Sequence, residues 1–263
     1  MTKDISDILR SWPSEDNDAG ARKIVGDDGT ELLQLRIDLG ILQMCLDGRP
    51  DGEKPFGQPS LLEHLTQMAE SQSEFKLDGE TWSELDREIM QFYHRRRALL
   101  ILGARSQSDG EPSEAVRCFR RAVRDANHNL RIMDFIRSHC ADEEYIEGHE
   151  RYRPFVLMHR TLAEAQTELL CKDPDQAVES LKTGMDAIEE VYQNAGSPEA
   201  ARQDPSIMQL RALERQIRRE HSIVQTLHEE LAAAIEAENF ERAAEIRDRL
   251  RAKLESKRSL DDG

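Results

Sequence analysis

The C-terminal segment 227–251 constrains the fold most, because its apolar residues recur at helical spacing in two separate stripes. The first stripe is Leu227, Leu231, Ala234 and Ile235, and the second is Phe240, Ala243, Ile246, Leu250 and Leu254. Residues three or four positions apart share one face of an α-helix, so each stripe predicts an amphipathic helix. Asn239 lies between the stripes and predicts an N-cap, since its side-chain oxygen can accept from the free amides of a first turn. We therefore expect a helical hairpin that reverses at residues 238–239.

Small side chains on this segment would let the two helices approach each other closely. They are Ala232, Ala233, Ala234, Ala243 and Ala244. A hairpin that is short and rich in alanine buries little apolar surface between its own helices. We expect it to need a further surface, either in its own chain or in another.

The residues of the hairpin resemble the UVR motif, a helical hairpin found in subunits B and C of the nucleotide-excision repair system. The matching residues are Leu227, Leu231, Ala234, Ile235, Glu238, Phe240, Glu241, Ala243, Ala244, Arg247 and Asp248. In that family the hairpin is a docking element between proteins and has no catalytic role. The resemblance therefore implies protein binding.

A docking surface on this hairpin would combine an apolar centre with surrounding charges. The predicted residues are Leu227, Leu231, Ile235, Phe240, Glu241, Arg247 and Asp248. The apolar side chains would supply most of the affinity, and the charges would set orientation and partner choice. The expected partner is a protein, and another UVR-type hairpin is one candidate, from a second copy or from an excision-repair component.

The same motif occurs in activator proteins of Clp ATPases and arginine kinases, which offers another functional class. Those proteins carry zinc-binding CxxC pairs upstream of the motif. The four cysteines of this chain form no such pair; they are Cys45, Cys118, Cys140 and Cys171. We interpret them as buried free thiols in a reducing compartment, and we predict no metal site.

The charge balance of the chain bears on its partners. The sequence has 36 Lys and Arg against 52 Asp and Glu, a formal net charge of −16, and the acidic excess lies mainly in residues 1–210. Such a body repels phosphates, which argues against general nucleic-acid binding. No apolar run is long enough to span a bilayer, and the N-terminus lacks a signal pattern. We expect a cytoplasmic protein without membrane contact.

Residues 1–52 are predicted to form an N-terminal segment with a small antiparallel sheet. Asp28-Gly29 indicates a tight turn between two strand-like runs, and residues 33–39 alternate between apolar and polar types. The sequence DGRPDG at 47–52 is typical of a plain turn. A weaker interpretation makes it a cation or anion site, although its spacing matches no calcium loop.

Residues 53–196 are predicted to form a helical body, so that the whole chain is mostly α. Two segments share one spacing: Ala115-x3-Phe119-x2-Ala122 and Ala177-x3-Leu181-x2-Gly184. This spacing resembles the second half of a tetratricopeptide (TPR) repeat, where small residues admit the neighbouring helix. An ordinary helical bundle is the alternative. We expect residues 197–206 to form a linker, and residues 207–258 a long helix followed by the UVR-type hairpin.

One basic face interrupts the acidic body. It comprises Arg95, Arg96, Arg97, Arg117, Arg120, Arg121 and Arg124. The last four lie at i, i+3, i+4 and i+7 and so share one helical face. They could contact an anion, a nucleic acid or an acidic partner, or they could pair with carboxylates of the chain itself, such as those at 142–144.

Nothing in the sequence indicates catalysis or a cofactor. It has no phosphate-binding loop, no dinucleotide fingerprint, no zinc-protease motif and no nucleophile elbow. We therefore expect a bacterial, cytoplasmic, non-catalytic adaptor that docks through its C-terminal hairpin. The alternatives are an excision-repair accessory with a weak DNA contact, and an activator of a Clp-type ATPase or a protein kinase.

Overall fold

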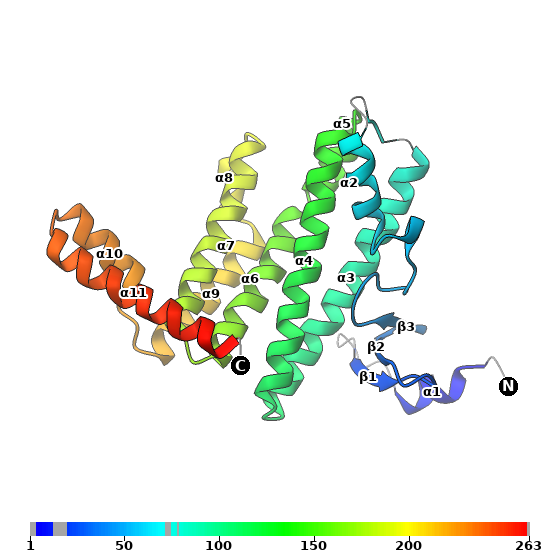
Figure 1. Cartoon of the computed structure of the whole chain (residues 1–263), viewed down its shortest axis with the longest axis horizontal. Coiled ribbons are helices and arrows are strands. Elements are labelled where there is room, and N and C mark those ends of the chain that lie inside the picture. Colours follow the sequence, from blue (N-terminus) through cyan, green and yellow to red (C-terminus); the bar gives the residue numbers. More distant parts are fainter. Residues whose placement is uncertain (1–3, 13–19, 72–74, 78, 262–263) are drawn as a thin grey trace.

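The computed structural model describes residues 4–12, 20–71, 75–77 and 79–261. A row of long helices carries a small sheet on the N-terminal side, and a helical hairpin projects on the other side (Figure 1). The predicted fold class is confirmed: the chain is mostly α, with a small N-terminal antiparallel sheet and a C-terminal helical hairpin. None of the described helices is long and apolar enough to cross a membrane.

The sheet has three antiparallel strands in the order β1-β2-β3 and follows a short helix. The elements are α1 (Ser6–Ser11), β1 (Ala21–Val25), β2 (Glu31–Ile37) and β3 (Gly40–Cys45). The predicted Asp28-Gly29 turn joins β1 to β2. Gly29 takes the left-handed φ of 83°, and the Asp28 carboxylate accepts a hydrogen bond from the Thr30 amide at 2.9 Å. Leu33 and Leu35 of β2 are fully buried against the helical body.

Nine helical segments follow the sheet and precede the C-terminal hairpin. Within the described residues they are the 3-10 turn η1 (Pro55–Gly57), α2 (Leu61–Ser71), α3 (Gly79–Ser108), α4 (Pro112–His139), α5 (Glu143–Glu150), α6 (Arg153–Leu170), α7 (Pro174–Asn194), α8 (Pro198–Ala201) and α9 (Pro205–Glu220). Most of them have proline in the first turn. Proline is tolerated there because the N–H groups of the first turn make no hydrogen bond within the helix.

The long helices pack in chain order. Helices α3 and α4 form one hairpin, α6 and α7 form a second, and α4 packs against α6 to join the two. Helix α9 then packs on α7, where Ile207, Leu210 and Ile217 enter the same apolar cluster as α6 and α7. The segment 197–206 holds α8 and the N-cap of α9, Asp204, which accepts from the amides of Ser206 and Ile207. A TPR-like description of this stack of hairpins stays a prediction.

The small residues of the predicted spacing lie where helices touch. Ala122 and Ala177 are completely buried. A Cβ added at Gly184 on α7 would collide with the side chain of Thr161 on α6. At Gly103 on α3, an added Cβ would lie 2.7 Å from the ring of Phe119 on α4. These close approaches hold both helical hairpins together.

Candidate functional site

The C-terminal hairpin consists of α10 (Leu227–Glu236) and α11 (Phe240–Asp261). The chain reverses at Glu238, whose φ of 54° lies in the left-handed region. Asn239 is the N-cap of α11, as predicted, and its side-chain oxygen accepts from the Arg242 amide at 3.1 Å. The sequence therefore located this turn correctly.

A reciprocal cap fixes the start of α10. The Thr226 hydroxyl accepts from the Glu229 amide at 3.2 Å, and the Glu229 carboxylate accepts from the Thr226 amide at 2.8 Å. This capping box satisfies two amides that otherwise lack helical partners. The Thr-x-x-Glu spacing is visible in the sequence and could have located the beginning of α10.

The interior of the hairpin is small and separate from the apolar clusters of the body. Ala234, Ala243 and Ile246 are buried, and Leu227, Leu231 and Leu250 pack against them while partly exposed. Leu227 and Leu231, which belong to the predicted docking surface, therefore contribute to the contact between α10 and α11.

The other predicted docking residues lie on the outside of the hairpin. Phe240 is 69% exposed and Ile235 is 53% exposed, and they flank the turn. Glu241, Arg247 and Asp248 on α11 are exposed as well. Two of the predicted apolar docking residues are therefore exposed to water, on a hairpin whose second helix also carries exposed charges.

Polar contacts hold the base of the hairpin to the body. Glu229 accepts from Arg218 of α9 at 2.6 Å and from Lys182 of α7 at 3.1 Å. The Thr226 hydroxyl donates to Glu179 of α7. These five residues, which we call the base clamp, orient the hairpin relative to the body. Figure 1 shows its turn pointing away from the body.

The base clamp shifts the acidity of its central carboxyl. Burial raises the pKa of Glu229, but hydrogen bonds from Arg218, the Thr226 amide and Lys182 outweigh this effect and lower it to about 2. Burial lowers the pKa of Lys182, but its hydrogen bonds and charge interactions with Glu229 and Glu179 together outweigh this effect, so that the net shift is upward. Both groups are thereby held in their charged forms at neutral pH.

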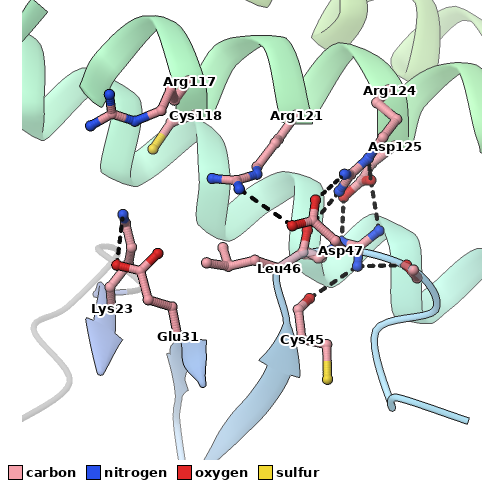
Figure 2. A network of polar contacts seen from close by, with 12 residues as sticks. Lys23, Glu31, Cys45, Leu46, Asp47, Arg117, Cys118, Arg121, Arg124 and Asp125 are labelled. Carbon is pink, nitrogen blue, oxygen red and sulfur yellow. Dashed lines mark hydrogen bonds and ion pairs between the residues drawn. The ribbon is translucent and has the colours of Figure 1, made fainter. Parts of the chain in front are cut away.

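The predicted basic face pairs with carboxylates of its own chain. Figure 2 shows Asp47 between Arg121 and Arg124 of α4. Arg124 donates to the Asp47 carboxylate at 2.6 Å and to the Leu46 carbonyl at 2.7 Å, while Arg121 lies 3.4 Å from the same carboxylate. The hydrogen bond from Arg124 is the main reason why the pKa of Asp47 is lowered. Arg117 donates to Glu114 at 2.8 Å.

Two further arginines of this face are buried. Arg95 donates to both oxygens of Asp125 at 2.7 and 2.8 Å, and also to the carbonyls of Cys45 and Gly48. Arg96 is 1% exposed and its Nε lies 3.3 Å from Nδ1 of His159. The remaining members, Arg97 and Arg120, are half-buried and exposed respectively.

The carboxylates that pair with this face are Asp47, Asp125 and Glu114 rather than the acidic run at 142–144. Asp142 instead caps α5, accepting from the Tyr145 amide at 3.0 Å. The turn at 47–52 is bound to the helices as well, because Arg49 is 4% exposed and lies 3.2 Å from Asp51 and 3.8 Å from Glu88. The arginine face therefore attaches the sheet and this turn to α3 and α4.

The comparisons with known proteins agree with the geometry of the hairpin. A family model described as the UvrB/uvrC motif matches residues 222–255, which include α10, the turn and most of α11. The chain thus carries a UVR motif at its C-terminal hairpin. No curated protein and no solved structure matches the chain.

Proposed function

We propose that this protein is a non-catalytic adaptor that docks on a partner protein through the outer surface of its UVR hairpin. The observation that carries the proposal is the exposure of Phe240 and Ile235 beside the turn of a hairpin that matches the UvrB/uvrC motif. Because these side chains are already partly covered, burying the rest of each in an interface would contribute about 1–2 kcal/mol.

The charges around these residues supply orientation. Glu241, Arg247 and Asp248 lie on α11, on the same helix as Phe240. A second UVR-type hairpin, with its own exposed apolar residues and charges of both signs, is the partner that this surface fits best. The partner hairpin belongs either to a second copy of this chain or to an excision-repair component.

The test replaces both exposed residues, in the double variant Phe240→Asp, Ile235→Asp. Leu231 is left unchanged, because it packs inside the hairpin. A matched control is Met208→Asp on α9, which changes an apolar residue of similar exposure (59%) outside the hairpin. Circular dichroism verifies that all variants keep their helical content.

Two measurements follow. Light scattering on the purified protein reports a dimer, and affinity capture from lysate reports other partners. We expect the hairpin variant to lose the dimer or the captured protein, and the Met208→Asp variant to keep it. Equal behaviour of the two variants would contradict docking through the hairpin.

Of the two alternatives, the DNA contact is weaker on the same observations. An excision-repair accessory that touches DNA through the arginine face would show binding that falls steeply with salt. Much of that positive charge is already offset by Asp47, Asp125 and Glu114. Activation of a Clp-type ATPase or a protein kinase would use the hairpin in the same way, so the captured partner distinguishes it.

A further inference from the structure

A deep cleft opens in the helical body. It has a volume of about 1040 Å³ and lies between α3, α4, α5 and the start of α6. Its walls carry many aromatic rings: Trp82, Tyr93, Tyr145, Tyr152 and Phe155. A concave surface of this size, mainly apolar with a few polar groups, is typical of a binding site.

The cleft walls are fixed by specific contacts. Asp86 on α3 accepts from the Tyr145 hydroxyl and from Nε2 of His149, each at 2.8 Å, so that α5 is held against α3. Trp82 and Tyr145 stack with their ring centroids 4.7 Å apart. The opening is less enclosed, since Tyr152 and Met90 are exposed to water.

Three buried polar atoms of the lining residues have no hydrogen-bond partner within the described part of the chain. They are Nη1 of Arg96, Oδ1 of Asn129 and Nε1 of Trp82. Arg96 and Asn129 are each 1% exposed. Burial lowers the pKa of Arg96 to about 10, which reflects the cost of its desolvated charge. Two donors and one acceptor on residues that line the cleft are therefore unpaired, and each is costly to leave so.

The rim of the cleft is acidic. Asp142 and Glu144 line it and are exposed. In the segment from Asp142 to Glu150, DEEYIEGHE, Glu147 and Glu150 pair with Arg151 and Arg153, whereas Asp142, Glu143 and Glu144 are exposed. A cationic group at the rim would be attracted by these charges and by the faces of the aromatic rings. An anionic ligand or a phosphate backbone would be repelled there.

We infer that this cleft binds a short, extended segment of another protein, in which a large apolar side chain lies next to a Lys or Arg. The apolar side chain packs among the rings, and the cation meets Asp142 and Glu144. The backbone amides of an extended segment supply acceptors for Arg96 and Trp82 and a donor for Asn129. A helical segment would not, because its backbone groups are already paired.

The test selects peptides from a randomised library displayed on phage, using the intact protein as bait. The enriched peptide is then synthesised with a fluorophore, and its affinity is measured by anisotropy. We expect a consensus with a large apolar residue beside Lys or Arg. An acidic consensus, or no enrichment at all, would overturn the inference.

Matched variants then locate the binding. Tyr152→Ser with Phe155→Ser removes two rings at the opening, and we expect a loss of about tenfold or more in affinity. Glu144→Lys should weaken binding severalfold, more at low salt than at high salt. The controls lie on the exposed surfaces of α9 and α8: Met208→Ser replaces an apolar residue, and Glu199→Lys reverses a charge.

Unchanged affinity in the ring variant would place the peptide elsewhere and overturn the inference. Circular dichroism of each variant excludes unfolding as the cause of a loss. The hairpin variant Phe240→Asp, Ile235→Asp should bind the peptide as the unchanged protein does. These variants therefore test peptide binding in the cleft separately from docking through the hairpin.

Discussion

Arg95 and Asp125 form a two-point ion pair that is completely buried between α3 and α4, at distances of 2.7 and 2.8 Å. The same guanidinium donates to the carbonyls of Cys45 and Gly48, so one side chain joins the two helices to the end of the sheet. Its charge-assisted hydrogen bonds offset the cost of taking both ions out of water.

Breaking this pair from one side should be costly. Asp125→Ala leaves Arg95 buried and without its counter-charge, and we expect a loss of about 3–5 kcal/mol in the free energy of unfolding. The surface pair Arg131–Glu63 serves as control, since both partners are partly exposed. Glu63→Ala should cost no more than about 1 kcal/mol. Urea denaturation measures the stability of both variants. Equal unfolding midpoints for Asp125→Ala and Glu63→Ala would contradict a stabilising role of the buried pair.

Replacing two helical glycines by alanine should change the stability of the protein in opposite directions. At Gly184 an added methyl group collides with Thr161, so Gly184→Ala should destabilise the protein by about 1–3 kcal/mol. At Gly148 an added Cβ meets nothing within 4 Å. Gly148→Ala should stabilise α5 by up to about 1 kcal/mol, because alanine is the better helix former. Thermal unfolding of the two variants checks the sign of each effect.

The base clamp should make stability depend on acid pH. The pKa of Glu229 is about 2 in the folded protein against an ordinary value of 4.5. A lowered pKa means that this stabilisation is complete above about pH 4.5 and disappears as the pH falls toward 2.

Glu229→Gln removes the titrating group, so its unfolding free energy should decline less between pH 5 and pH 3. The unchanged protein should lose about 1 kcal/mol more unfolding free energy than the Glu229→Gln variant over this range, after allowance for solvent screening. Urea titrations at a series of pH values measure it. Parallel pH profiles for the two proteins would show that Glu229 is not held by the clamp.

Thr226 has two roles at the base of the hairpin, as the cap of α10 and as a donor to Glu179. Thr226→Ala removes both, and we expect the local stability of α10 to fall by about 1 kcal/mol. Hydrogen exchange at the α10 amides should accelerate, while exchange in α3 and α4 stays unchanged. Thr226→Ser keeps the hydroxyl and is the matched control.

Local signals in the sequence predicted several elements of the secondary structure. The Asp28-Gly29 turn, the N-cap at Asn239 and the helical spacing of the C-terminal stripes depend on neighbouring residues only. The UVR hairpin was recognisable for the same reason. Leu39 shows the limit of such signals: it continues the alternation of β2 in sequence, yet it lies in the turn before β3 and is 86% exposed.

The sequence alone did not show which apolar residues of the hairpin are exposed to water. Leu231 and Ile235 belong to one apolar stripe, but α11 covers the first and leaves the second in water. Which part of a stripe is covered depends on the angle at which the chain leaves the turn. The pairing of Asp47 with Arg121 and Arg124 was hidden as well, because it links residues more than 70 positions apart.

The aromatic cleft could not be predicted from the sequence for the same reason. Trp82 and Phe155 lie on different helices, and only the packing of α5 and α6 against α3 brings their rings to one cavity. The run Arg95–Arg97 reads as a solvated basic patch in sequence, whereas two of its members are almost completely buried.

The base clamp joins the hairpin to the body through charged and hydroxyl groups, while the apolar cluster of the hairpin stays within its own two helices. Dissolved ions screen charged contacts far more than they weaken apolar ones. We therefore expect the orientation of the hairpin relative to the body to depend on ionic strength. In dilute salt the base clamp should hold Phe240 at a fixed angle, and in concentrated salt the hairpin should move over a wider range of angles.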